Sequence, residues 1–203
     1  MQTTQIALAI LIGYALGCIQ PAYILGKLVR HIDIRGQGSG NAGASNVVMV
    51  LGWKYGIITG LVDIFKAVLA VLIVRWLYPA TPALAYSAGM ASILGHVFPF
   101  YLGFRGGKGV ATLVGMMIGY DLRLGVLFAA VVAVVALTTD YIALGSITVF
   151  TLLPIVTFIL DLPLACQIAA ILLAIIAYLK HVENVQRIRK GEEPHVRAAM
   201  KKQ

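Results

Sequence analysis

Long apolar stretches occupy most of the chain, and short polar or glycine-rich segments separate them. A helix that crosses a hydrocarbon core about 30 Å thick needs around 20 apolar residues, or fewer where the membrane is locally thinned. The stretches that fit this pattern are Thr4–Leu28, Gly56–Leu77, Ala83–Phe100, Val110–Tyr120, Leu124–Thr139, Ile142–Leu160 and Pro163–Leu179. The pattern therefore predicts an all-α polytopic membrane protein, in which the fourth transmembrane helix is short.

The amino-acid composition supports a membrane protein and excludes other classes. Of the 203 residues, 60% are hydrophobic and 12% are charged, whereas a soluble domain carries about 25% charged residues. These values exclude a soluble two-domain enzyme and a disordered chain. The net charge of +8 does not indicate nucleic-acid binding, because the basic residues lie between apolar runs and form no stripe with aromatic residues. We expect a single integral membrane domain over residues 1–203.

The basic residues are unevenly distributed over the segments between the apolar stretches. They follow the first stretch as Lys27, Arg30 and Arg35, the third as Arg105 and Lys108, and the last as Lys180, Arg187, Arg189, Lys190, Arg197, Lys201 and Lys202. Because basic residues gather on the cytoplasmic side, we expect the N-terminus outside and the C-terminus in the cytoplasm. This orientation needs an odd number of crossings, so Val110–Tyr120 must cross and the helices number seven. The polar segments then share the cytoplasmic face.

The segment Gly36–Asn46 is the first candidate binding loop. Its glycines allow successive backbone N–H groups to approach an anion, and its serines and asparagines add neutral donors. The candidate anion-binding residues here are Arg35, Gly38, Ser39, Gly40, Asn41, Gly43, Ser45 and Asn46. A flexible linker between helices is the alternative. The segment is not a Walker loop, because no Gly-Lys-Ser/Thr follows and no strand precedes it.

The segment Gly95–Thr112 is the second candidate, because basic residues and glycines directly precede a predicted helix. A helix N-terminus offers unpaired N–H groups and a positive dipole end, which favour a phosphate. The candidate phosphate-binding residues are His96, Arg105, Gly106, Gly107, Lys108 and Gly109. The alternative for Arg105 and Lys108 is a purely topological role, and a lone histidine such as His96 is more often a packed residue than a catalyst.

Three further polar positions lie near the same predicted face. His181 and Asn184 share one side of a helix at i, i+3 spacing, where an imidazole and an amide could bind or deprotonate a hydroxyl; an interfacial helix is the alternative. Ser146 adds a weaker signal. Asp63 and Lys66, within a predicted span, are expected to face the interior as a pair, with a structural role as plausible as a direct one. No metal site is expected.

Several strings resemble the bacterial acyl-phosphate:glycerol-3-phosphate acyltransferases. They are Gly-Ser-Gly-Asn-Ala-Gly-Ala-Ser-Asn at 38–46, Gly-His-Val-Phe-Pro at 95–99, Phe-Arg-Gly-Gly-Lys-Gly-Val-Ala-Thr at 104–112, and His181, Glu183, Asn184, Arg187 and Gly191 to Pro194. The resemblance implies a seven-helix enzyme of the bacterial inner membrane with its active site facing the cytoplasm. It would transfer a fatty acyl group from acyl phosphate to the 1-hydroxyl of sn-glycerol 3-phosphate, giving lysophosphatidate and phosphate, the first step of phospholipid synthesis.

The resemblance also implies roles for particular residues and for partners. Lys108, His181 and Asn184 would be catalytic, and the glycine loops, Arg105 and Ser146 would hold substrate. The proton of the acceptor hydroxyl would go to the leaving phosphate or to His181. No cofactor is implied, the partners would be the two substrates and the lipid bilayer without nucleic acid, and we expect a monomer.

Some positions depart from the family pattern, and they keep other functions open. Met49 stands where the family has an arginine, and Ser45 replaces a threonine. One alternative is a divergent paralogue that acylates another hydroxylated acceptor. A small-anion transporter is a second, although such sites usually lie near the bilayer midplane between repeated halves, and no internal repeat is found here. A non-catalytic membrane subunit is the third.

Overall fold

The computed structural model describes residues 3–200, and within them every regular element is a helix. The α-helices are α1 Thr3–Gly17, α2 Pro21–Arg30, α3 Ala44–Leu51, α4 Trp53–Leu77, α5 Pro82–Val97, α6 Val110–Tyr120, α7 Leu122–Thr139, α8 Ile142–Ile159, α9 Leu164–Lys190 and α10 Val196–Met200. Two short 3-10 helices, η1 Ile34–Gly36 and η2 Phe100–Leu102, lie in the connections. The all-α prediction is confirmed.

Within the described residues, six helical segments are long and apolar enough to cross a membrane, and Val110–Tyr120 is a shorter apolar helix. The six long predicted spans and the short fourth one are thus confirmed as apolar helical segments. Many large apolar side chains remain exposed, as expected where lipid takes the place of water. Examples are Leu61, Phe65, Trp76, Phe158, Ile159 and Leu179.

The first predicted span differs from the structure, because it is broken in two. α1 ends at Gly17 and α2 begins at Pro21, with Gln20 in a non-helical conformation between them. Proline has no backbone N–H and disfavours helical geometry in the residue before it, so it ends one helix and starts the next. The last helix also continues beyond the predicted span, from Leu179 to Lys190, so that it carries His181 and Asn184.

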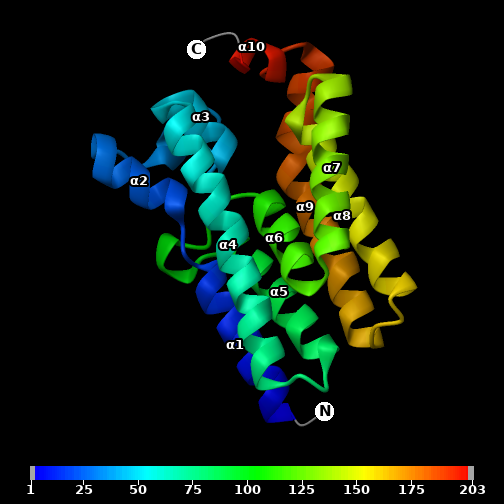
Figure 1. Ribbon diagram of the computed structural model, residues 1–203. Coiled ribbons are helices and arrows are strands. Elements are labelled where there is room, and N and C mark those ends of the chain that lie inside the picture. Colours follow the sequence, from blue (N-terminus) through cyan, green and yellow to red (C-terminus); the bar gives the residue numbers. More distant parts are fainter. Residues whose placement is uncertain (1–2, 201–203) are drawn as a thin grey trace. The chain divides into compact units, whose positions relative to one another are not determined.

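Internal contacts divide the chain into two compact units, which meet in sequence at Gly125 and Val126. In the first unit, α5 is buried on nearly all sides, with α1, α4 and α6 against it (Figure 1). Gly13 and Gly17 of α1 lie directly on the backbone of Ala88 and Ser92 of α5, where a Cβ atom would overlap a carbonyl oxygen. Small residues allow membrane helices to approach this closely.

The second unit is built from α7, α8, α9 and the short α10, which Figure 1 draws in yellow-green to red. α8 packs on α9, and Gly145 of α8 lies against the backbone of Val132 of α7. Pro154 lies inside α8, and α9 ends at Gly191, whose φ of 72° reverses the chain. This reversal sends the C-terminal segment back along its own unit.

Candidate active site

Asn46, in the first turn of α3, organises the first glycine loop. Its side chain is fully buried. The amide Nδ2 donates to the carbonyl oxygens of Ile34 (3.0 Å), Gln37 (3.0 Å) and Asn41 (2.9 Å), and Oδ1 accepts the backbone N–H of Ser39 at 2.8 Å. An amide has only two N–H donors, and the loop itself occupies both. Asn46 therefore shapes the loop, and the expectation that its own amide holds a phosphate finds no support in this geometry.

The glycines of this loop meet specific backbone requirements. Gly38 and Gly40 have φ values of 57° and 72°, a conformation that favours glycine. A Cβ on Gly38 would overlap the Oδ1 atom of Asn46, and one on Gly43 would lie 2.8 Å from Nδ2 of Asn41. Gly38, Gly40 and Ser45 are exposed, and Ser39 and Asn41 are half-buried. These five residues remain the accessible candidates for contact with a ligand.

Arg35 connects the two candidate loops. Its guanidinium is paired with Asp33, with Nη2 2.7 Å from Oδ2, and Nη1 donates to the carbonyl oxygens of Leu102 (2.7 Å) and Arg105 (3.1 Å). The bond from Arg35 holds the pKa of Asp33 below its ordinary value, and the same pairing raises the pKa of Arg35. The structure uses Arg35 as a brace between the two loops, and its contact with a phosphate stays a prediction.

The second loop is anchored to the end of α5. The backbone N–H of Gly106 donates to the carbonyl of Val97 at 3.1 Å, and that of Gly107 donates to the carbonyl of His96 at 3.2 Å. A Cβ on Gly107 would overlap Nε2 of His96 and lie 2.7 Å from the carbonyl oxygen of Ala42. Gly107 is therefore the point where the first loop, the second loop and the His96 side chain meet.

The start of α6 has the features expected of an anion site. Gly109, with φ of 84°, is the N-cap residue, and the first N–H groups of a helix have no partner within it. Lys108 is half-buried and Arg105 is exposed beside this helix end. The buried hydroxyl of Thr112, in the first turn, has no hydrogen-bond partner. Sequence analysis did not single out Thr112, although its place in the first turn of the predicted helix was the available signal.

His96 lies deeper than sequence analysis expected of a phosphate-binding residue. Its side chain is 3% exposed, and Nδ1 lies 2.8 Å from Nζ of Lys66 and 3.2 Å from Oδ1 of Asp63. Lys66 and Asp63 form an ion pair of 2.7 Å, as predicted for the interior of the second span. The burial of His96 favours a supporting role over contact with a ligand.

In the second unit, His181 and Asn184 lie on one buried face of α9, as their spacing predicted. Nδ1 of His181 lies 2.7 Å from the carbonyl oxygen of Ala177. A carbonyl can only accept, so the proton is assigned to Nδ1, and in a neutral ring the lone pair then belongs to Nε2. Ser146, near the start of α8, is buried, and its hydroxyl donates to the carbonyl of Ile142 at 2.9 Å.

Glu193 supports Asn184, a contact that sequence analysis did not identify. Nδ2 of Asn184 donates to Oε1 of Glu193 at 2.6 Å, and Nε of Arg187 donates to Oε2 at 2.7 Å. The turn at Gly191 makes this possible by returning Glu193 to the face of α9. The glycine followed by acidic residues was a usable signal, but it did not indicate which acid turns inward.

The C-terminal segment is also attached to the turn between α7 and α8. Asp140, with φ of 66°, accepts the backbone N–H of Arg197 on Oδ1 at 2.8 Å, and its carbonyl accepts that of Val196 at 3.0 Å. Nδ1 of His195 lies 3.1 Å from Oδ2. The bond from the Arg197 backbone holds the pKa of Asp140 below its ordinary value. We call Asp140, His195, Val196 and Arg197 the C-terminal clasp.

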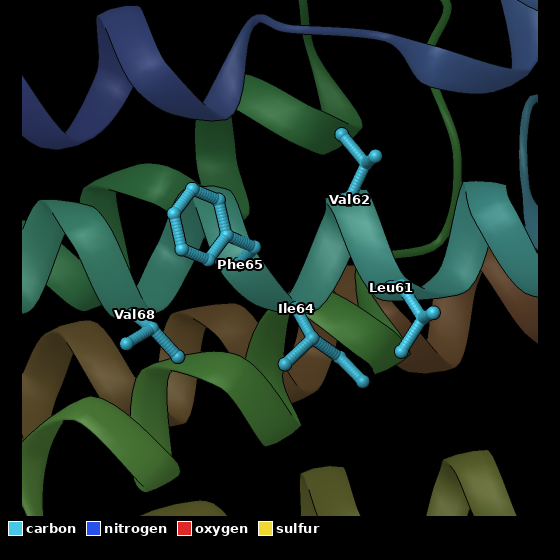
Figure 2. A pocket seen from close by; sticks show the side chains of 5 residues that line it. All are labelled: Leu61, Val62, Ile64, Phe65 and Val68. Atoms are coloured by element: carbon cyan, nitrogen blue, oxygen red, sulfur yellow. The ribbon is translucent and has the colours of Figure 1, made fainter.

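Two other kinds of site to consider in the described residues are a metal site and a pocket. In the part of the chain that the structure describes, no three His, Cys, Asp or Glu residues gather as metal ligands. Figure 2 shows an open hollow lined by Leu61, Val62, Ile64, Phe65 and Val68, all from α4. Its lining is apolar, so it offers no group for a phosphate. The predicted catalytic residues themselves are divided, with Lys108 in the first unit and His181 and Asn184 in the second.

Comparisons with known proteins agree with the resemblance seen in the motifs. The family model described as glycerol-3-phosphate acyltransferase matches residues 7–191. A glycerol-3-phosphate acyltransferase of Thermoanaerobacter pseudethanolicus is 41% identical over 186 residues, 92% of this chain and 93% of the relative. One from Shouchella clausii is 42% identical over 193 residues, 91% and 92% of the two chains.

Solved structures are similar as well. The crystal structure of PlsY (YgiH), an integral membrane glycerol 3-phosphate acyltransferase, in its glycerol 3-phosphate form has a TM-score of 0.83 and 31% identity, and the match covers 94% of both chains. The lysophosphatidic acid form of that protein has a TM-score of 0.80 and 30% identity, with the same coverage.

Proposed function

The chain belongs to the glycerol-3-phosphate acyltransferase family, and from this premise we propose that it acylates the 1-hydroxyl of sn-glycerol 3-phosphate with acyl phosphate as donor. The products are lysophosphatidate and inorganic phosphate. The acceptor and the product are supported by the relatives' names and by the forms in which the similar PlsY structure was solved. Acyl phosphate as the donor rests on the resemblance of the loop motifs.

The observation that carries the proposal is the braced pair of glycine loops in the first unit. Arg35 ties one loop to the carbonyl oxygens of the other, and the second loop leads into the N-terminus of α6 beside Lys108. Backbone N–H groups at a helix start, together with a lysine point charge, favour a phosphate group. Both proposed substrates are phosphorylated, so a site of this chemistry suits either.

The reaction needs orientation and charge stabilisation more than it needs a strong base. The hydroxyl oxygen of the acceptor attacks the acyl carbonyl carbon, and the bond from that carbon to the phosphate oxygen breaks. Phosphate departs with the electron pair, and the hydroxyl proton goes either to that phosphate or to Nε2 of His181. Because acyl phosphate is already activated, positioning and electrostatic stabilisation account for most of the rate.

We assign Lys108 to the stabilisation of phosphate charge, and His181 and Asn184 to the acceptor hydroxyl. His181 suits that role because its Nδ1 atom is bonded to the carbonyl oxygen of Ala177, which fixes the orientation of the ring. Asn184 is held in one orientation by Glu193. Ser39, Asn41, Ser45 and Ser146 are assigned to oxygen atoms of the substrates.

The proposal includes an orientation in the membrane. The N-terminus lies outside, the C-terminus lies in the cytoplasm, and the two loops face the cytoplasm of a bacterial cell from its inner membrane. Support comes from the excess of lysine and arginine in these segments and after α9. We expect the enzyme to act as a monomer.

The test uses purified protein in lipid, palmitoyl phosphate and sn-glycerol 3-phosphate, with phosphate and lysophosphatidate measured together. Lys108→Ala is compared with Lys54→Ala, which removes an exposed lysine from the same unit. Acceptor-dependent formation of both products, lost only in Lys108→Ala, supports the proposal. Preference for palmitoyl-CoA contradicts the donor. Phosphate release without lysophosphatidate points to another acceptor, a possibility raised by the exposed Met49 on α3.

A further inference from the structure

Asp63 and Lys66 form a buried ion pair that the proposed reaction does not use. They lie three residues apart on α4, are 1% and 2% exposed, and their charged atoms are 2.7 Å apart. Burying two charges costs desolvation free energy that their attraction often fails to offset, and an apolar pair of similar size is commonly as stable. Ionisable residues within a membrane span also point to function. Stability alone is therefore a weak explanation for this pair.

The Nζ atom of Lys66 lies among three acceptors from three parts of the chain. Oδ1 of Asp63 is 2.7 Å away, the carbonyl oxygen of Ile19 2.6 Å, and Nδ1 of His96 2.8 Å. An ammonium group has three N–H donors, which matches this set. Nδ1 of His96 then accepts, and the ring proton belongs on Nε2, a tautomer assigned from the donor count. Asp63 holds Lys66, and Lys66 holds His96.

His96, which Lys66 holds in place, contacts the second glycine loop through its backbone carbonyl and through its ring. Its carbonyl oxygen accepts the backbone N–H of Gly107 at 3.2 Å and Nε2 of Gln20 at 2.9 Å. The Nε2 edge of its ring lies against the Cα atom of Gly107, where a Cβ has no room. Gly107 directly precedes Lys108 in the chain. The position of His96 therefore determines the positions of Lys108 and of the first residues of α6.

We propose that Asp63 and Lys66 are positioning residues, which act through His96 to hold Gly106–Gly109 in the conformation that presents Lys108 and the start of α6 to a phosphate. The expected change in KM rests on the proposed function. The expected change in the conformation of Gly106–Gly109 does not. The competing explanation is that Lys66 only satisfies the carbonyl of Ile19 at the break between α1 and α2, since unpaired backbone groups are costly in a membrane.

The first test removes both charges together, in Asp63→Asn/Lys66→Met, so that neither is left unpaired. We expect hydrogen exchange of the Gly106 and Gly107 amides to become at least about tenfold faster. We also expect the KM for glycerol 3-phosphate or for palmitoyl phosphate to rise about tenfold, because small misplacements of binding groups are costly. Measuring both KM values identifies which phosphate the loop binds.

Leu84→Ala is the matched control, because it truncates a fully buried side chain on α5 about three turns before His96 and leaves the cluster intact. General destabilisation reduces the amount of active enzyme and so lowers the apparent kcat, but it does not change KM. We expect Leu84→Ala to lower thermal stability while the KM values and the exchange of Gly106 and Gly107 stay as in the unmodified protein.

A second variant covers the case in which the double variant fails to fold. His96→Asn keeps an amide oxygen near the place of Nδ1 for Lys66 but removes the ring edge that packs on Gly107. We expect it to fold and to show the faster loop exchange. The proposal is overturned if His96→Asn leaves exchange of Gly106 and Gly107 unchanged. Absence of acyl transfer in the unmodified protein would instead refute the proposed function, while the exchange measurement still decides this inference.

Discussion

The two units hold their candidate residues in different ways. In the first unit, the start of α6 beside Lys108 forms the candidate phosphate site, and polar side chains such as Arg35, Asn46 and His96 turn inward to support the loops. In the second unit, His181 and Asn184 extend from one regular helix, α9, and a single returning acid supports the latter. In the first unit several polar side chains therefore support the loop backbone, whereas on the helix of the second unit the side chains themselves are the candidates.

Gly107→Ala should have the largest effect, because it tests the loop-based unit at its most crowded position. The added methyl group would meet the His96 ring and the carbonyl oxygen of Ala42, so both loops must shift. We expect kcat/KM for acyl transfer to fall at least about 100-fold.

The control for this substitution is Gly60→Ala on α4, where a Cβ would lie 3.7 Å from that of Ala44, an ordinary contact. It should retain activity, because alanine is also the better helix former. If Gly107→Ala turned over substrate at the rate of Gly60→Ala, the convergence of the two loops at Gly107 would have no catalytic meaning.

Asn46→Asp should come next, because it separates support of the loop from contact with substrate. Aspartate keeps the acceptor for Ser39 but cannot donate to the three carbonyl oxygens that Nδ2 contacts. At about 1 kcal/mol for each hydrogen bond, we expect a loss of about 2–3 kcal/mol in unfolding free energy, measured by thermal or denaturant unfolding, together with a large loss of activity.

Ser45→Ala is the matched substitution in the same loop, since Ser45 is exposed. It should leave stability unchanged and alter only the KM for a phosphorylated substrate. The reverse result, a stable Asn46→Asp and a destabilised Ser45→Ala, would mean that the support and ligand roles have been interchanged.

The same contrast explains what the sequence could predict. Helix number followed from apolar length, and the shared face of His181 and Asn184 followed from helical periodicity, because side-chain direction in a helix depends on spacing alone. The break at Pro21 was missed because the apolar run continues through it. The inward roles of Arg35 and Asn46 were missed because composition does not reveal which way a loop side chain points. The contacts of Glu193 with Asn184 and of Asp140 with Arg197 were missed because they form only where the segment after Gly191 turns back on its own unit.

Glu193→Gln should have a smaller effect, because it weakens support in the helix-based unit without removing a candidate catalytic group. The bond to Asn184 becomes neutral or reverses its polarity, and the ion pair with Arg187 is lost, because a glutamine carries no charge. We expect kcat to fall about tenfold, less than for Asn184→Ala, in the same acyl-transfer assay. Glu192→Gln, one position earlier and exposed, is the control, and equal activities of the two glutamine variants would remove Glu193 from the site.

A substitution in the C-terminal clasp, Asp140→Asn, should have the smallest effect on acyl transfer. It tests whether the second unit depends on contacts outside its helices. The pKa of Asp140 is lowered chiefly by the backbone N–H of Arg197. A carboxyl with a lowered pKa in the folded state stabilises that state above its ordinary value near about 3.9, and the contribution disappears as the pH falls through the lowered value. The exchange protection of the Arg197 amide, relative to its intrinsic rate, should therefore decrease as the pH falls below about 4. Asp140→Asn should abolish this pH dependence, whereas Asp161→Asn, at the turn after α8, should retain it.

Unchanged acyl transfer in Asp140→Asn would mean that the returning segment acts through Glu193 alone, whereas a loss of activity would extend the support of α9 to the turn between α7 and α8.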